Sequence, residues 1–78
     1  MKIKHIATRD LTLEIAKRIA ETAGKTAADT KILCRDKGAN AKSLMGVIAL
    51  SYRKGETLWL IAEGRDADRV IETLKTIL

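Results

Sequence analysis

Residues 40–50, Asn-Ala-Lys-Ser-Leu-Met-Gly-Val-Ile-Ala-Leu, place a single serine directly before a run of apolar and small residues. A serine in this position accepts hydrogen bonds from the first backbone N–H groups of a helix, which have no partner within the helix itself. The segment therefore predicts a short helix from Leu44 to about Tyr52, with Ser43 as its N-cap.

The sequence on either side of this segment predicts alternating strands and helices. Apolar residues recur at every second position in the strand-like stretches, and at spacings of three and four in the helical ones. The expected strands are Lys2–Ala7, Thr30–Arg35, Ala39–Ala41 and Thr57–Ala62, and the flanking helices are Leu11–Ala23, capped by Asp10 or Thr12, and one that starts at Asp66 or Asp68. The order β-α-β-β-α-β-α predicts an α+β fold in which helices cover one face of an antiparallel sheet.

Length and composition limit the kinds of protein that the chain can form. Its 78 residues are 46% hydrophobic and 32% charged, the balance of one globular domain, here residues 1–78. With no Phe, one Trp and one Tyr, the core must be aliphatic. The single cysteine allows no internal disulfide and no cysteine-rich metal site, and we expect neither metal nor cofactor. No apolar run approaches the roughly 20 residues that span a bilayer, and no signal-peptide segment is recognisable, so we expect a cytoplasmic protein without membrane contact.

The net charge of +5 raises the question of a nucleic-acid partner. The sequence contains no block of like charges and few aromatic residues for base stacking, which favours a solvated, mildly basic surface instead. The alternative is a small nucleic-acid-binding module on the sheet face around Trp59, Lys2 and Lys4. Trp59 lies on the face opposite to Leu58 and Leu60, where it is either an exposed contact residue or shielded by its neighbours.

His5 and Cys34 are isolated side chains with possible chemistry. His5 is the only histidine and lacks the further ligands that a metal needs, so an ordinary strand residue is favoured. Strict alternation places it on the same face as Ile3, so either His5 is partly buried or Ile6 lies beyond a bulge. Cys34 alternates within its strand as a small core residue.

Residues 40–50 resemble the regulatory-serine segment of HPr, the small phosphocarrier of the bacterial phosphoenolpyruvate-dependent sugar phosphotransferase system. The likeness continues through Gly55-Glu56-Thr57 and through Ala62-Glu63-Gly64-Arg65-Asp66-Ala67, and is motif-specific from about residue 38 to 70. The resemblance implies the HPr fold, an open-faced β-sandwich with a four-stranded antiparallel sheet and three helices on one face. The order of elements derived above agrees with it.

The start of the first helix departs from the family pattern. HPr proteins have Gly-Leu-His-Ala-Arg-Pro-Ala there, and the histidine carries the phosphoryl group. This chain has Asp-Leu-Thr-Leu-Glu-Ile-Ala at residues 10–16, which puts Thr12 at the place of the histidine and Glu14 at that of the arginine. A threonine hydroxyl is not a free nucleophile near neutral pH, and a glutamate repels phosphate. We therefore expect no catalytic residue, no enzyme activity and no phosphohistidine carrier activity.

In lacking this histidine, the chain is similar to the catabolite-repression HPr type, which acts as a regulator. That likeness implies phosphorylation of Ser43 by HPr kinase or a similar serine kinase, and contact with a transcriptional regulator or a metabolic enzyme. The surface implied is the helix side that groups Leu44, Met45 and Ile48. Two alternatives are that these residues belong to the core beneath a serine that only caps, and that the protein is a divergent phosphocarrier.

Overall fold

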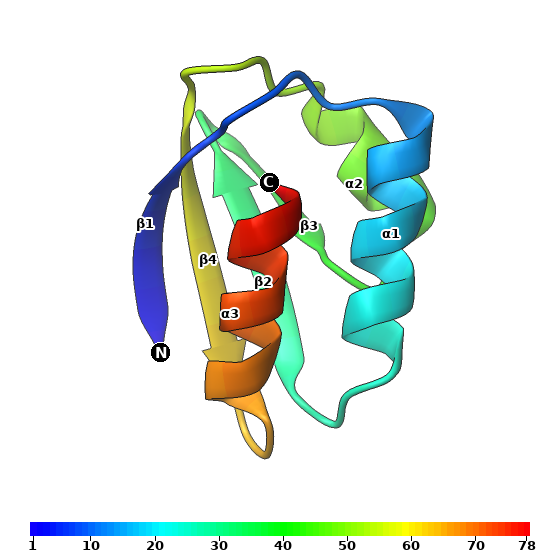
Figure 1. Ribbon diagram of the computed structural model, residues 1–78, viewed down its shortest axis with the longest axis vertical. Helices are drawn as coiled ribbons and strands as arrows, with labels where there is room; N and C mark the ends of the chain where they lie inside the picture. The colour runs from blue at the N-terminus through cyan, green and yellow to red at the C-terminus, as the bar shows by residue number, and fades with distance from the viewer.

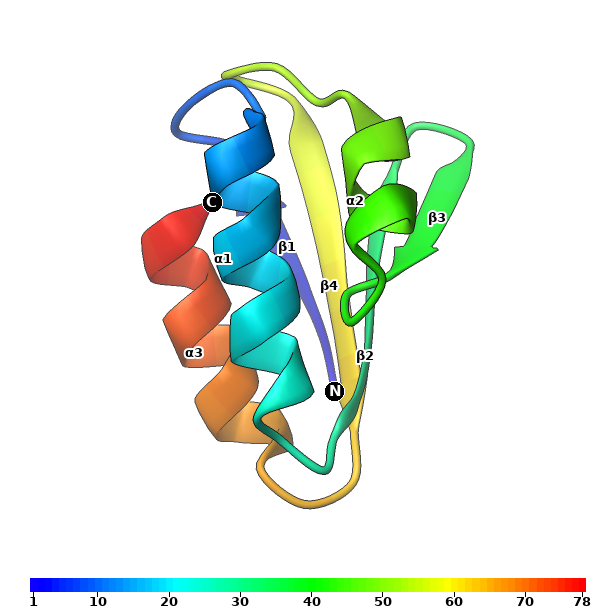
Figure 2. The ribbon, with the colours of Figure 1, turned by 90° about the vertical axis from the view of Figure 1, so that its right-hand side faces the viewer.

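The computed structural model describes all residues from 1 to 78 and contains seven elements in the expected order (Figure 1). They are β1 (Lys2–Ile6), α1 (Leu13–Gly24), β2 (Asp29–Cys34), β3 (Lys37–Asn40), α2 (Leu44–Leu50), β4 (Thr57–Glu63) and α3 (Ala67–Ile77). The strands form one antiparallel sheet in the order β1-β4-β2-β3. Figure 2 shows all three helices on one face of this sheet and none on the other. The predicted α+β open-faced sandwich is confirmed.

The core lies between the sheet and the helices and is aliphatic, as the composition requires. Strand β4 supplies its centre, because its alternation turns Leu58, Leu60 and Ala62 toward the helices, where all three are buried. Tyr52 is the one aromatic residue of the core and is only 1% exposed. The helices contribute residues at spacings of three and four, among them Ile15, Ile19, Val47, Leu50, Val70, Ile71 and Leu74.

Strand β1 pairs with β4 without interruption, from Lys2 opposite Ile61 to Ile6 opposite Thr57. No bulge separates His5 from Ile6. His5 is therefore partly buried, while Ile6 is exposed. The Nε2 atom of His5 is buried and has no hydrogen-bond partner.

The helix after Ser43 is shorter than the sequence indicated. It ends at Leu50, because Ser51 adopts a left-handed backbone conformation with a φ of 47°. This turn directs the chain away from the helix axis and sends the Tyr52 side chain into the core. The expected continuation of the helix to about Tyr52 is wrong, because the apolar pattern does not distinguish a helical from a buried loop position.

The hairpin between β2 and β3 also turns earlier than expected. Arg35, assigned from the pattern to a strand, has a φ of 56° and forms the turn with Asp36. Strand β3 consequently begins at Lys37 rather than at Ala39. Gly38 suits this pairing, since a Cβ there would lie only 2.9 Å from Cδ2 of Leu33 on the opposite strand.

For each of the two longer helices, the sequence offered two residues as the N-cap, and the structure identifies one of them. Thr12 precedes α1 and accepts a hydrogen bond from the helix, whereas Asp66 precedes α3 without a side-chain capping bond. The left-handed conformation of Asp66 (φ 68°) explains the missing bond, because an N-cap normally needs an extended backbone. No helix of the protein is both long and apolar enough to cross a membrane.

Candidate functional site

Ser43 is an exposed residue that joins β3 to α2. Its backbone is extended (φ −96°, ψ 110°), and its Oγ accepts a hydrogen bond of 3.1 Å from the backbone N–H of Gly46. A Cβ at Gly46 would lie 3.2 Å from this Oγ, so the glycine leaves room for the serine. The predicted N-cap is confirmed, and its side chain remains at the surface.

Two apolar side chains of α2 point to solvent. Met45 is 79% exposed and Ile48 is 37% exposed. Leu44 is half-buried and packs against the core, to which Val47 and Leu50 belong. The helix therefore buries one side and displays Met45 and Ile48, with Leu44 at the boundary between the two.

Three residues that the sequence analysis named, Asp10, Thr12 and Glu14, lie at the start of α1. Thr12 is exposed, and its Oγ1 accepts a hydrogen bond of 3.2 Å from the backbone N–H of Ile15. Asp10 does not cap this helix; its Oδ1 accepts a bond of 2.8 Å from the backbone N–H of Lys54. Glu14 lies exposed in the first turn, where its carboxylate suits the positive end of the helix.

A surface pocket of about 400 Å³ joins the start of α1 to the end of α2. Figure 2 shows these two helix ends side by side. Thr12 and Ile48 both line the pocket, whereas Ser43 does not, because it lies at the other end of α2. The remaining lining residues are Asp10, Leu11, Leu13, Ser51, Tyr52 and Arg53.

An ion pair between Arg35 and Glu56 holds the C-terminal end of α2. The Arg35 guanidinium pairs with Glu56 and also donates a hydrogen bond of 2.8 Å to the carbonyl of Leu50. Glu56 in turn accepts a bond of 2.8 Å from the backbone N–H of Arg53. Hydrogen bonding from the Arg35 guanidinium and then from the Arg53 N–H lowers the pKa of Glu56. The network connects the β2–β3 turn to the loop after α2 and thereby positions that helix.

Two buried groups beneath this network are kept in their neutral form. Burial raises the pKa of Tyr52 to about 12, and its hydroxyl has no hydrogen-bond partner. Burial, and next the charge of Glu56, raises the pKa of the Cys34 thiol. A thiol needs a lowered pKa and access to solvent to react, so Cys34 is a core residue.

Trp59 lies on the sheet face that carries no helix and is 38% exposed. The ammonium group of Lys2 lies 5.1 Å from the centroid of its ring. Of the two sequence-based alternatives, exposure describes this residue better than shielding. His5 of β1 faces the other side of the sheet, so the sheet separates its imidazole from the indole.

The chemistry available at these positions is that of hydroxyl groups. No group of three or more His, Cys, Asp or Glu side chains could hold a metal ion. His5 lies on β1, away from the pocket at the start of α1. Thr12 and Ser43 are the exposed hydroxyl-bearing N-caps, and each accepts a backbone hydrogen bond.

Three further residues of this region, Arg35, Glu56 and Leu13, were not identified from sequence patterns. Arg35 and Glu56 are 21 positions apart, and their pairing follows from the sheet register and the loop after α2. Leu13 is an exposed apolar residue in the pocket between α1 and α2. Its position could have been inferred, because it falls outside the buried stripe of Ile15, Ala16 and Ile19.

The elements form a small open-faced sandwich with two exposed hydroxyl-bearing N-caps, Thr12 and Ser43. A family model described as "PTS HPr component phosphorylation site" matches residues 2–78. The phosphocarrier protein HPr of Mycoplasma capricolum is 33% identical over 57 residues, which are 73% of this chain and 64% of that protein. The chain therefore belongs to the HPr family of phosphotransferase-system phosphocarriers, which are not enzymes.

Solved structures of the family share the fold. HPr from Bacillus anthracis matches with a TM-score of 0.90 and 26% identity, over 100% of this chain and 95% of that one. The Bacillus subtilis catabolite-repression protein Crh, described as a dimer with a swapped domain, matches with a TM-score of 0.78 and 28% identity, over 90% and 80%. In curated relatives, the matched segment spans from 8% to 72% of the relative's own length.

Proposed function

We propose that this HPr-family protein does not carry phosphoryl groups on histidine and instead acts as a regulatory protein phosphorylated on Ser43. The observation that carries the proposal is the exposed Ser43 side chain beside the solvent-exposed Met45. A kinase can approach the hydroxyl without unfolding the segment. A partner can then recognise the phosphate and an apolar side chain together.

Neither Thr12 nor His5 is suited to carry a phosphoryl group as phosphohistidine. Thr12 caps α1 where family members have their phosphorylated histidine. Its hydroxyl is hydrogen-bonded to the backbone N–H of Ile15 and not to a side chain that could act as a base. His5, the only imidazole, is partly buried in β1 with its Nε2 atom inaccessible. A phosphohistidine carrier needs an accessible ring nitrogen as nucleophile.

A phosphate on Ser43 would change the recognition properties of this surface while leaving the fold in place. It adds nearly two negative charges and three strong acceptor oxygens to an exposed position. Lys42 adjoins the site, and no acidic residue lies between Lys37 and Tyr52 along the chain. We expect the protein that binds phosphorylated Ser43 to be a transcriptional regulator or a metabolic enzyme. It should present an arginine or lysine to the phosphate, near an apolar groove for Met45 and Ile48. The likeness to Crh supports a regulatory role.

The test uses the two serines of the chain, Ser43 and Ser51, as an internal comparison. HPr kinase transfers the γ-phosphoryl group of ATP to a serine hydroxyl, releasing ADP and a proton. Incubation with this kinase and ATP should add one phosphate, mapped by mass spectrometry to Ser43. Ser43→Ala should remain unmodified, and Ser51→Ala should be modified at the wild-type rate.

An ordinary HPr in the same tube serves as the positive control for the kinase. If that HPr is modified while Ser43 is not, Ser43 is a capping residue only and the proposal fails. Melting curves of the phosphorylated protein provide the second readout. A large loss of stability on phosphorylation would also contradict a regulatory site on an intact fold.

A further inference from the structure

The face of the sheet opposite to the helices carries an apolar centre bordered by lysines. Trp59 of β4 lies between Lys4 of β1 and Leu33 of β2 in one row of paired residues. Ile61 lies between Lys2 and Lys31 in the next row. Because side chains alternate along each strand, all six point to the same, uncovered side.

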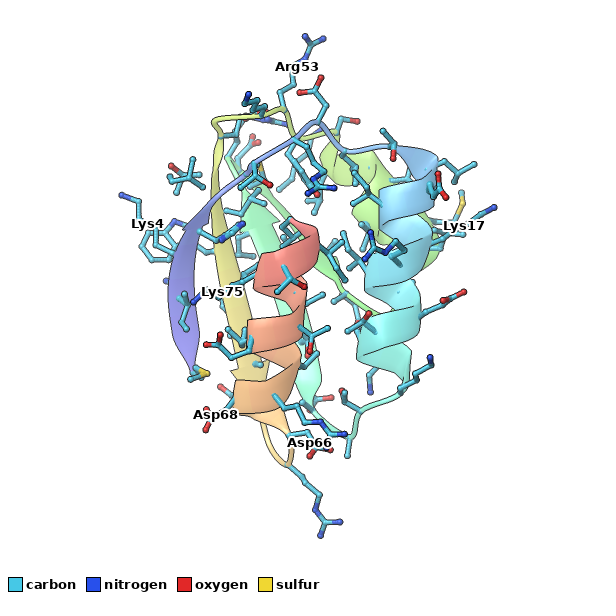
Figure 3. All side chains as sticks on the ribbon, viewed as in Figure 1. Lys4, Lys17, Arg53, Asp66, Asp68 and Lys75 are labelled. Carbon is cyan, nitrogen blue, oxygen red and sulfur yellow. The ribbon has the colours of Figure 1, made fainter.

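None of the three lysines forms an ion pair with a carboxylate of this protein; the ion pairs of the chain involve other residues. Lys2 instead lies against the Trp59 ring. Figure 3 shows Lys4 extending from β1 away from the helices, whereas Lys17 extends from α1 on the far side of the molecule. The lysines of the open face are therefore free to neutralise negative charges on a partner.

Two shallow hollows of about 260 and 280 Å³ flank Lys31 on this face, and Lys31 and Asn40 line both. The larger hollow lies beside Leu33 and Gly38. The smaller one contains Asp29 and Glu63, which face each other across β2 and β4 and are also without ion-pair partners. The two carboxylates lie at one end of the face, so the positive charge is concentrated around Trp59.

We propose that this open face binds single-stranded nucleic acid, independently of the proposed role of Ser43. A base stacks on the exposed indole of Trp59, and Lys2 moves from the ring to the adjoining phosphate. Lys4 and Lys31, on either side of the apolar centre, each neutralise a further phosphate. The next base enters the hollow beside Lys31, where the carboxylates of Asp29 and Glu63 accept the two hydrogen bonds of an exocyclic amino group.

The geometry favours a single strand over a duplex or an acidic polypeptide. Single-strand binders combine aromatic stacking platforms with cationic groups that follow the backbone, and a four-stranded sheet face is an established platform for this purpose. A duplex hides the faces of its bases from the indole. An acidic polypeptide offers carboxylates to the lysines, but it has no nucleobase that could stack on Trp59 and donate an amino group to Asp29 and Glu63.

The test measures fluorescence anisotropy of a labelled decamer of deoxycytidine, with the ribocytidine decamer and a DNA duplex of equal length in parallel. With three phosphates neutralised, the plot of log affinity against log salt should have a slope of about −2. Lys4→Glu should reduce the magnitude of that slope by about 0.7. Trp59→Ala should weaken binding by about fivefold or more, and Trp59→Phe should retain most of it.

The matched control is Lys17→Glu, which makes the same charge change on the opposite side of the molecule. It should bind like the wild-type protein, apart from the small effect of net charge. Equal binding of polyglutamate would show simple polyanion attraction and overturn the proposal. So would equal losses for Lys4→Glu and Lys17→Glu, or no binding of either decamer at 50 mM salt. Tighter binding of either decamer than of the duplex supports the proposal, whereas equal binding of the duplex would overturn it.

Discussion

The protein exposes large hydrophobic side chains in two regions that are built in different ways. Leu13, Met45 and Ile48 protrude from α1 and α2, whereas Met1, Ile6 and Trp59 belong to the region of β1 and β4. On the strands, exposure follows from alternation and from the lack of a covering helix. On the helices, it depends on where each helix starts and ends.

This difference means that the two regions should respond differently to change. The surface of α2 is positioned by contacts from distant parts of the chain, such as the Arg35 bond to the carbonyl of Leu50. Trp59 is positioned by its own strand and by pairing on both sides of it. Remote substitutions should therefore disturb the helical region more than the sheet face.

The largest expected effect concerns phosphoryl transfer at the start of α1. With phosphoenolpyruvate and the first enzyme of the phosphotransferase system, the wild-type protein should acquire no acid-labile phosphate. The double variant Thr12→His with Glu14→Arg should acquire some, because it supplies an imidazole and a cation at an exposed helix start. Thr12→Asn, which keeps a good N-cap without an imidazole, is the control. An acid-labile phosphate on the wild-type protein would refute the non-carrier proposal.

The second effect is the alkaline loss of stability caused by Tyr52. Burial raises the folded-state pKa of Tyr52 to about 12, whereas an unfolded tyrosine titrates near 10. The unfolded state therefore loses the proton first, and stability should fall between these values by up to about 2 to 3 kcal/mol. Denaturant unfolding at a series of pH values measures this fall.

Tyr52→Phe is the matched control, because it removes the titrating group and a hydroxyl that has no partner. We expect its stability near neutral pH to equal or exceed that of the wild-type protein. It should also lack the tyrosine contribution to the alkaline loss. An absorbance titration of wild-type Tyr52 with a midpoint near 10 would contradict its burial.

The third effect tests the exposed side of α2. Met45→Ala combined with Ile48→Ala should raise the KM of HPr kinase by about tenfold, as loss of an interface anchor typically does. The melting temperature should fall less than for truncation of the fully buried Val47, because Met45 is 79% and Ile48 is 37% exposed. Trp59→Ala, on the other face, should leave this KM unchanged. If all three substitutions had equal effects on KM, the assignment of α2 as the contact region would be wrong.

The fourth effect concerns the network that positions α2. Arg35 lowers the pKa of Glu56, so the stabilising contribution of that carboxylate is complete above a pH of about 4.3. It is lost as the pH falls through the lower folded-state value. Glu56→Gln should therefore show a smaller acid-induced drop in melting temperature than the wild-type protein. Glu72→Gln, at an exposed position of α3, should behave like the wild-type protein.

The smallest effect is an optical one on the sheet face. Acrylamide should quench the fluorescence of Trp59 readily, because the indole is partly open to solvent. Ser43→Asp and Glu56→Gln should leave this quenching unchanged, since both act on the helical side. A blue-shifted and poorly quenched emission from the monomer would instead place the indole in a buried environment.

Much of the fold follows from local patterns in the sequence. Alternation identified β4 and the outward direction of Trp59, and apolar spacing identified the helices. Capping chemistry identified Ser43 and included Thr12 among the alternatives, because an N-cap interacts with backbone groups only a few residues away. The resemblance of residues 40–50 to the HPr family supplied the topology that these local rules leave open.

The sequence by itself thus determined the types and order of the elements, the aliphatic core and the Ser43 N-cap. Tertiary structure alone decided where α2 stops, how Arg35 meets Glu56, and which lysines surround Trp59. Apolar periodicity and helix capping involve residues only a few positions apart, so they can be recognised within a single stretch of sequence. Ion pairs and sheet register join segments far apart in the chain, and they form only when the packing of the whole core brings those segments together.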